Sequence, residues 1–441
     1  MLDIVIKNGR VIDPANGRDE IADVAIEQGK IVKVGRVSGK AREVIDASGK
    51  IVCPGLIDIH VHCREPGHEE EETLATAAAA AVAGGFTTIC AMPNTHPPID
   101  NETSVQYVLQ RGSEAAAARV LPVGCITKGR KGEELAEMAA MLAAGAVAFS
   151  DDGDGVASTA VMYRALQYAR MLDVSLMQHC QDNDLAGGAM NSGAVAVRLG
   201  LGGIASAGEE LMLQRDLVLA ERTGARYHVQ HVSSAWSVEL IRQAKARGVK
   251  VTAEATPHHL LLTDAACASF DPVYKVNPPL RSSSDVEAVR RGVADGTIDC
   301  LATDHAPQSA EEKELEFALA PFGIISLECA FSLYVKALID TGLLDWPGLI
   351  ARMTINPARV IAAEGKTSSS YRPAGLIGLI EGLGTLSVGA VADVTVIDPK
   401  KRWTIRTEKF RSKSRNCPYD SWRVKAKPVF TIVAGQVKYA G

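Results

Sequence analysis

The sequence contains no hydrophobic run long enough to cross a membrane. Its most apolar stretch, residues 75–85, is rich in alanine and far shorter than the roughly 20 residues that a spanning helix needs. The N-terminus, MLDIVIKNGR, has no charged region followed by an apolar stretch and a small-residue cleavage site. We therefore expect a cytoplasmic protein with no membrane segment.

Positive charge is not in excess either. Lys and Arg number 47 against 52 Asp and Glu, which gives a formal net charge of −5 and argues against nucleic-acid or anionic-membrane partners. The nine cysteines are odd in number and scattered, and no CxxC occurs. In a chain of 441 residues this indicates reduced, mostly buried thiols and no disulfide framework.

The glycine motifs that bind phosphates are also missing. No GxGxxG and no P-loop follows any predicted strand, which disfavours an open doubly wound sheet, the alternative architecture. Between residues 51 and 365, apolar runs alternate with helical stretches, and eight parallel βα units are the number that closes a barrel. We predict an α/β fold with a (β/α)8 TIM-type barrel over residues 54–365. The eight runs are 56–62, 86–93, 119–127, 146–152, 174–180, 225–233, 250–259 and 297–307.

Both ends of the chain have a different character. Residues 1–53 contain short β-branched runs around Asn8-Gly9, Gln28-Gly29 and Ser48-Gly49, and similar runs return in 384–398 and 428–441. Because chain ends often lie near each other, we predict a small β-sandwich formed by 1–53 and 366–441.

Histidines and aspartates gather at the ends of the predicted strands. In a parallel barrel these ends converge on one face, where active sites are built. His60 and His62 lie two apart on the first strand, so their side chains point to the same face, about 6.6 Å apart along it. His179, His231 and Asp304 end the fifth, sixth and eighth runs. Imidazoles and carboxylates of this kind suit zinc, so we predict a metal site.

The fourth run ends in two aspartates. Asp151 and Asp152 are both candidate ligands, because strand parity at the end of a run does not separate them.

Several segments carry a resemblance to a known family. They cover nearly the whole chain in the expected order, and with them the sequence resembles the amidohydrolase superfamily and, within it, the class I dihydroorotases. The segments are DIHVHCREPG (58–67), GGFTTICAMPNTHPP (84–98), FSDDG (149–153), YHVQHVS (227–233), TAEATPHHL (252–260), KVNPPLR (275–281), DGTIDCLATDHAP (295–307) and APFGIISLECAF (320–331).

The resemblance implies a ligand set for one or two zinc ions. His60, His62 and Asp304 would hold one ion and His179 and His231 the other. By analogy the second aspartate, Asp152, bridges the pair, and Asp304 also moves the proton in catalysis. Dihydropyrimidinase-like and allantoinase-like relatives use a carboxylated lysine as the bridge, but residues 144–153 contain no lysine.

The implied reaction is the zinc-dependent, reversible cyclisation of N-carbamoyl-L-aspartate to L-dihydroorotate and water, in pyrimidine (UMP) biosynthesis. Arg64 and Asn94 suit the free carboxylate of that substrate. By resemblance Asn277, Phe322 and Gly323 complete its recognition. Gln308 departs from the family pattern ATDHAPH, because glutamine can donate a hydrogen bond but cannot become cationic.

Two other functions stay open at this point. One is another cyclic amidohydrolase, of the allantoinase or dihydropyrimidinase/hydantoinase type. The other is a non-catalytic subunit bound to aspartate transcarbamoylase, although such chains typically lose metal ligands and this one has the full set. The family also implies a homodimer, in which an active chain can still dock that transferase. The charged segment 307–323 is expected to be either a loop over the site or a solvated helix.

Overall fold

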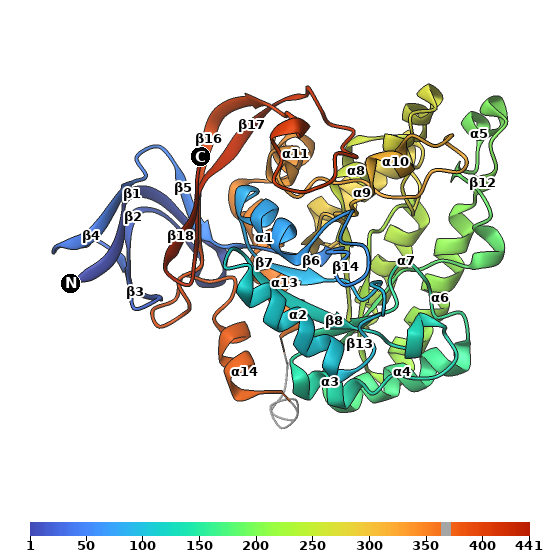
Figure 1. Ribbon diagram of the computed structural model, residues 1–441, viewed down its shortest axis with the longest axis horizontal. Coiled ribbons are helices and arrows are strands. Elements are labelled where there is room, and N and C mark those ends of the chain that lie inside the picture. The colour runs from blue at the N-terminus through green and yellow to red at the C-terminus, as the bar shows by residue number, and fades with distance from the viewer. Residues whose placement is uncertain (363–371) are drawn as a thin grey trace.

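The computed structural model describes residues 1–362 and 372–441, and it has two parts. A β-sheet built from both ends of the chain stands beside a barrel of strands and helices (Figure 1). Among the described residues, no helix is long and apolar enough to cross a membrane. All nine cysteines are free and buried, as the sequence predicts.

The barrel consists of eight parallel strands, and each predicted run contains one of them. Each strand pairs with the next one along the barrel in chain order. β10 pairs directly with β13, because β11 and β12 form a separate two-stranded sheet. The first and last strands meet through a parallel bridge between Val61 and His305, and the His62 N–H donates to the His305 carbonyl at 2.9 Å. The predicted (β/α)8 barrel is confirmed. Its strands are β6 Leu56–Val61, β7 Phe86–Ala91, β8 Arg119–Gly124, β9 Ala148–Ser150, β10 Ser175–Gln178, β13 Arg226–Val229, β14 Val251–Ala255 and β15 Cys300–Leu301.

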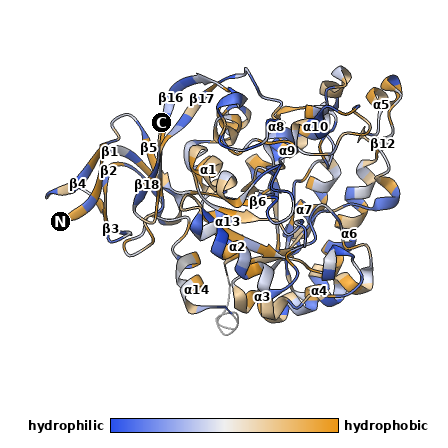
Figure 2. Cartoon of the chain, in the orientation of Figure 1, coloured by the Kyte–Doolittle hydropathy of each residue, from blue (hydrophilic) through white to orange (hydrophobic). Residues whose placement is uncertain are grey.

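The strands are buried on both faces, which explains why the sequence shows continuous apolar runs instead of alternation. All six residues of β6 are buried, and hydrophobic residues follow the strands at the centre of the barrel (Figure 2). The alanine-rich helix α1 buries seven of its ten residues, and its short side chains allow the helix to pack closely on the strands.

Helices surround the barrel, and several short helices lie in the loops between its strands and helices. Seven helices, α1, α2, α3, α4, α6, α7 and α9, lie between consecutive barrel strands and return the chain to the next strand. The helices are α1 Leu74–Ala83, α2 Glu102–Glu114, α3 Met138–Ala144, α4 Thr159–Leu172, α5 Ala194–Leu199, α6 Ser206–Thr223, α7 Ala235–Ala246, α8 Pro257–Leu261, α9 Ser283–Asp295, α10 Ala310–Lys313, α11 Ala330–Tyr334, α12 Trp346–Met353, α13 Ile355–Ile361 and α14 Ala374–Glu381.

The second part joins the two ends of the chain in one eight-stranded sheet. β16 pairs antiparallel with β5, and β5 pairs parallel with β1, so the last strands continue the sheet begun by the first. The sheet encloses its own apolar core, which includes Ile6, Ile26, Val52, Val396 and Ile432. The predicted composite β-sandwich is therefore confirmed. Its strands are β1 Leu2–Asp13, β2 Arg18–Glu27, β3 Lys30–Gly35, β4 Ala41–Asp46, β5 Ile51–Pro54, β16 Val394–Thr404, β17 Arg423–Val433 and β18 Gln436–Ala440; a separate two-stranded pair, β11 Met190–Asn191 and β12 Gly203–Ile204, lies beside the barrel.

The predicted domain limits stay a proposal. β5 ends at Pro54 and β6 begins at Leu56, close to the proposed division between 53 and 54. The other division, between 365 and 366, lies outside the described residues.

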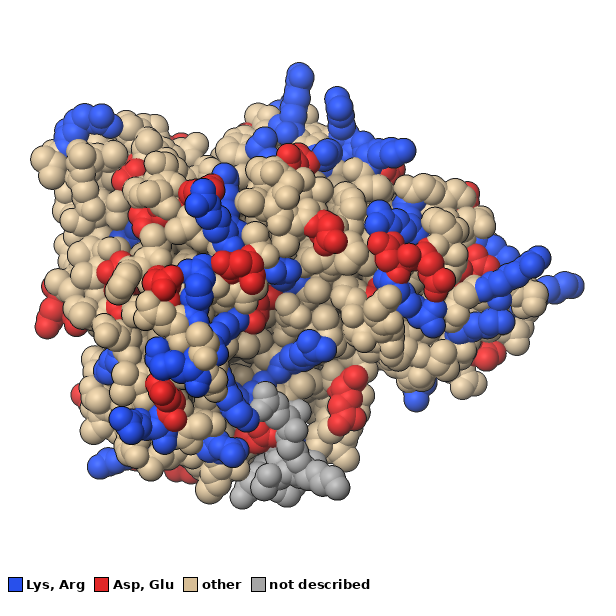
Figure 3. All heavy atoms as spheres, turned by 180° about the vertical axis from the view of Figure 1, so that it is seen from behind, with Lys and Arg blue, Asp and Glu red and all other residues tan. Residues whose placement is uncertain are grey.

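Acidic and basic side chains are interspersed over much of the face seen in Figure 3.

Candidate active site

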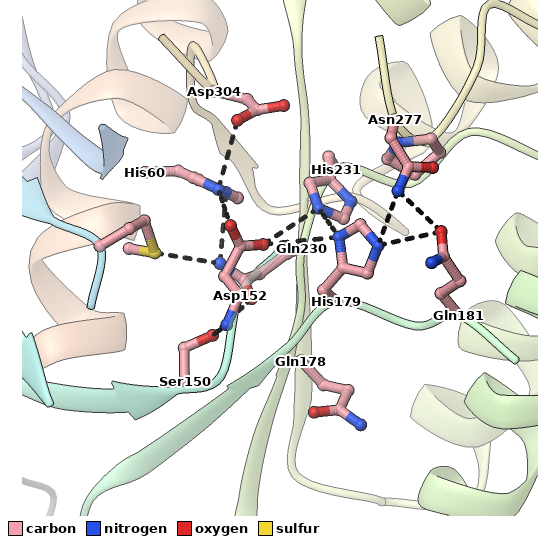
Figure 4. Close-up of polar contacts among 12 residues, drawn as sticks. His60, Ser150, Asp152, Gln178, His179, Gln181, Gln230, His231, Asn277 and Asp304 are labelled. Carbon is pink, nitrogen blue, oxygen red and sulfur yellow. Dashed lines mark hydrogen bonds and ion pairs between the residues drawn. The ribbon is translucent and has the colours of Figure 1, made fainter. Parts of the chain in front are cut away.

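Six candidate ligands come together at the carboxyl ends of the barrel strands. Asp152 is central, and its two carboxylate oxygens face different histidines (Figure 4). Its Oδ2 lies 3.3 Å from Nε2 of both His60 and His62. Its Oδ1 lies 3.3 Å from Nε2 of His231 and 3.6 Å from Nδ1 of His179. This arrangement is that of a carboxylate shared between two sets of donors.

Asp304 completes the first set. Its Oδ1 lies 3.0 Å from Nε2 of His62 and 3.4 Å from Nε2 of His60. Donors around a tetrahedral zinc with bonds of 2.0–2.1 Å are about 3.3 Å apart. The distances of 3.0–3.4 Å from His60 and His62 to Asp304 and Asp152 match that spacing, so these donors fit a metal ion.

The charges of the site point to the same conclusion. Burial disfavours ionisation of Asp152 and Asp304, but the adjacent histidines outweigh it and hold the pKa of both carboxyls well below the usual range. A third ionised carboxylate, Glu254, lies behind His60. The buried Nε2 of His60 has no hydrogen-bond partner. A divalent cation bound here would take the place of the histidine protons beside these carboxylates and would bind the Nε2 of His60.

Asp151 does not take part in the cluster. Its Oδ1 accepts hydrogen bonds from the backbone N–H groups of Ile126 at 2.8 Å and Thr127 at 3.1 Å, and its Oδ2 accepts one from the Thr127 hydroxyl. Of the two aspartates that the sequence left open, the structure thus brings Asp152 to the histidines and turns Asp151 toward the neighbouring loop.

The backbone at the site is strained. His231 has a φ of +30°, Asp304 of +45° and Arg64 of +62°, in the left-handed region that side chains with a Cβ rarely adopt. Such conformations persist only where the surrounding structure imposes them, and they concentrate at functional sites. Here they turn each chain segment sharply at the end of a strand, so that its side chain faces the barrel mouth.

The predicted substrate-binding residues line one cavity of about 310 Å³. The cavity opens onto His62, Asp152, His179, His231 and Asp304, and His60 lies beneath it. Its wall also contains every residue that the sequence assigned to substrate recognition, namely Arg64, Asn94, Asn277, Gln308, Phe322 and Gly323.

Hydrogen bonds already hold several of these side chains. Arg64 Nε lies 2.9 Å from Glu71 and donates to the Pro307 carbonyl at 3.0 Å. Asn94 Oδ1 lies 2.7 Å from Nδ1 of His62, and it thereby orients that ring. Asn277 Nδ2 donates to Gln181 at 2.7 Å. The cavity wall is therefore preorganised.

The two histidines at the end of the seventh run, His258 and His259, differ from each other. His259 is held by the Thr256 hydroxyl at 2.9 Å and the Pro278 carbonyl at 3.0 Å, as a core residue would be. Both ring nitrogens of His258 are buried without a hydrogen-bond partner. Burial lowers the pKa of both rings, so they stay neutral.

Two residues that the sequence analysis missed support the site. Glu254 lies inside β14 and bonds to His60; a single acidic residue within a buried strand was the available signal. Asn416 reaches the cavity wall from the far end of the chain, and nothing in the local sequence pointed to it.

Comparison with known proteins identifies the family. The dihydroorotase of Pelotomaculum thermopropionicum is 50% identical over 436 residues, which cover 98% of each chain. That of Caldanaerobacter subterraneus subsp. tengcongensis is 46% identical over 438 residues, 99% of this chain and 97% of the relative. The chain belongs to the dihydroorotase family. A family model described as Dihydro-orotase-like also matches residues 49–237 of this dihydroorotase-family chain.

Solved structures place the dihydroorotase-family fold among related enzymes. The L-hydantoinase (dihydropyrimidinase) from Arthrobacter aurescens aligns with a TM-score of 0.83 at 25% identity, over 100% of this chain and 96% of the other. The D-hydantoinase (dihydropyrimidinase) from Thermus sp. aligns with a TM-score of 0.80 at 25% identity, over 99% and 95%. Both likenesses extend over the barrel and the composite sheet together.

Proposed function

We propose that this protein is an active dihydroorotase, which interconverts N-carbamoyl-L-aspartate and L-dihydroorotate in pyrimidine (UMP) biosynthesis. The observation that carries the proposal is the shared carboxylate of Asp152, which lies between two groups of histidines and faces a cavity lined by Arg64. Full-length relatives at 50% and 46% identity carry the dihydroorotase name.

The ion in this proposal is zinc, with one or two bound per chain. His60, His62 and Asp304 would hold one ion, His179 and His231 the second, and Asp152 would contact both. When bound, zinc supplies a water molecule with a pKa of about 7 and polarises the carbonyl of the ring amide.

Asp304 would transfer the proton. Its carboxylate lines the cavity beside the predicted metal ligands, where it can accept a proton from the attacking water. It can then deliver that proton to the ring nitrogen as the amide bond breaks. In the direction of synthesis the same carboxylate takes the proton from the ureido nitrogen, and water leaves.

Arg64 would bind the free carboxylate of the substrate. Its guanidinium is largely buried, and although burial lowers its pKa, an arginine stays charged. Asn94 and Asn277 also line the cavity and offer amide groups, and Phe322 and Gly323 form a further part of its wall. Gln308 donates to the Phe322 carbonyl at 2.9 Å, so its amide holds that wall.

The experiment that tests this function compares substrates. Purified protein loaded with zinc is incubated with L-dihydroorotate, hydantoin and allantoin, and product formation is followed for each. We expect turnover of L-dihydroorotate and none of the uncharged hydantoin, because hydantoin has no carboxylate for Arg64 to bind. Turnover of hydantoin or allantoin alone would reject the proposal in favour of the alternative amidohydrolases.

A second measurement addresses the non-catalytic alternative. Metal analysis of protein purified without chelator should find one or two zinc ions per chain, and no bound metal would favour a silent subunit. Size measurement of the protein alone tests the proposed homodimer. Repeating that measurement with added aspartate transcarbamoylase tests the proposed association between the two enzymes.

A further inference from the structure

The loop between β16 and β17 leaves the terminal sheet and lies against the mouth of the barrel. We call residues 405–422 the C-terminal strap. The Ser414 hydroxyl of the strap donates to the Glu71 carbonyl at 2.7 Å, and the Asn416 carbonyl accepts a hydrogen bond from the Ile325 N–H at 3.0 Å. A part of the chain that belongs to the sheet by sequence therefore contacts the loops that surround the cavity.

Asn416 makes the central contacts of the strap. Its side chain is buried, with 6% of the residue exposed. Its Nδ2 donates to the carbonyls of Ala306 at 2.9 Å and Gly323 at 3.1 Å, and its Oδ1 accepts a hydrogen bond from the Gln308 N–H at 3.3 Å. One amide thus joins two segments that are separated along the chain.

Those two segments form one wall of the substrate cavity. Ala306, Gln308, Phe322 and Gly323 all line it. The segments pack tightly, since a Cβ added at Gly323 would lie 2.6 Å from the Ala306 carbonyl oxygen. Loss of the Asn416 contacts would therefore change the spacing of this wall without touching a metal ligand.

The strap also contacts the segment that supports Arg64. The Lys413 N–H donates to Glu72 at 3.2 Å, and the Ser412 hydroxyl donates to the other oxygen of that carboxylate. The neighbouring Glu71 forms the 2.9 Å ion pair with Arg64. The strap therefore contacts the supports of both Arg64 and Gln308.

We propose that Asn416 is a positioning residue for substrate recognition, which sets Gln308 and Gly323 at the spacing that the substrate requires. The identity of that substrate rests on the proposed function. The role of Asn416 in fixing the wall does not, because it follows from contacts within the chain.

The substitution Asn416→Asp tests this role. It keeps the size of the side chain and the acceptor for the Gln308 N–H, but it removes both donors and sets a carboxylate oxygen beside two carbonyl oxygens. We expect KM for L-dihydroorotate to rise about tenfold, since two buried hydrogen bonds are lost, while kcat stays within about twofold. Zinc content should not change.

Asp420→Asn is the matched control. Asp420 is exposed on the same strap and accepts a hydrogen bond from the Thr407 N–H at 2.9 Å, an interaction that an asparagine oxygen can keep. This variant should match the unmodified protein in both KM and kcat.

Hydrogen exchange without substrate separates this inference from the proposed function. Amides in 306–325 should exchange faster in Asn416→Asp, whatever the enzyme acts on. Unchanged exchange and KM would overturn the positioning role, as would a fall in kcat accompanied by loss of zinc.

If Asn416→Asp does not fold, Asn416→Ser, which keeps one donor, takes its place. It should show the same rise in KM, and an unchanged KM there would also overturn the positioning role. No turnover by the unmodified protein, with the exchange difference intact, would reject only the proposed substrate.

Discussion

The carboxylate of Glu254 lies 2.5 Å from Nδ1 of His60, on the side of the ring opposite the nitrogen that faces Asp152 and Asp304. The other oxygen of Glu254 lies 3.1 Å from Nε2 of His228. A histidine whose second nitrogen is held by a carboxylate has a fixed tautomer and ring orientation, and it is a stronger metal ligand.

Replacing Glu254 should therefore weaken metal binding. In Glu254→Gln we expect the affinity for zinc to fall about 10–100-fold, because the ring of His60 loses its carboxylate partner. Competition with a chromogenic chelator measures this affinity. Glu239→Gln, at a half-buried glutamate on α7 outside the metal cluster, serves as control, and equal affinities in the two variants would contradict the role of Glu254.

The adjacent aspartates offer a paired test of the shared ligand. Asp152→Asn should lose at least one metal ion. The amide nitrogen of the new side chain cannot bind a metal ion, so one of the two ions would lose its shared ligand. Asp151→Asn should keep its metal but lower the free energy of unfolding by about 1–3 kcal/mol, because its contacts to Thr127 and Ile126 are disturbed. Metal analysis and urea unfolding distinguish the two. Metal loss in Asp151→Asn alone would reverse the assignment.

Asp304→Asn should reduce turnover of L-dihydroorotate. An amide cannot carry the proton between water and the ring nitrogen, so we expect kcat to fall about 10²–10⁴-fold. Circular dichroism should show that the fold is kept, and metal content should be measured beside the rate. Near-normal kcat in a metal-loaded Asp304→Asn would remove this residue from the chemistry.

Glu328 should make stability depend on pH. Burial raises the pKa of its carboxyl to about 7, although it accepts hydrogen bonds from the Arg411 and Ser412 N–H groups. The folded state therefore binds this proton more tightly than the unfolded state does. Stability from this group is present below about pH 4.5 and declines as the pH rises to about 7.

Glu328→Gln should remove this part of the pH dependence. Between pH 5 and pH 8 the unmodified protein should lose about 1–2 kcal/mol more than the variant, less than the full shift because the side chain is partly exposed. Urea unfolding of both proteins at the two pH values measures the difference. Parallel pH profiles would contradict the assignment.

The barrel was predictable because its strands are buried on both faces. Runs such as 56–62 and 225–233 are buried strands that contain polar residues, and their last histidines, His62 and His231, lie at the barrel mouth, so one run marks both the strand and its functional end. The composite sheet was predictable because both chain ends contain short β-branched runs separated by turns.

Other features depend on contacts that no local pattern encodes. Asp151 and Asp152 are adjacent and chemically equal, and only the turn after β9 decides which one faces the histidines. The segment 307–323 contains a single helical turn, α10, and Lys313 from that turn donates to the carbonyls of Pro272, Lys275 and Pro321. Such long-range tethers, like those of Asn416, are visible only once the chain is folded.

The pairing of β6 with the segment after β15 has a consequence for how the protein responds to loss of its metal. His60 and His62 lie on one side of that junction and Asp304 on the other, so an ion that they share would cross-link the first and last strands of the cylinder. Depletion of the ion would remove this cross-link, and we expect the junction to become more accessible to proteases. Nicking near residue 304 would thus report the loss of zinc earlier than a decline in bulk helicity.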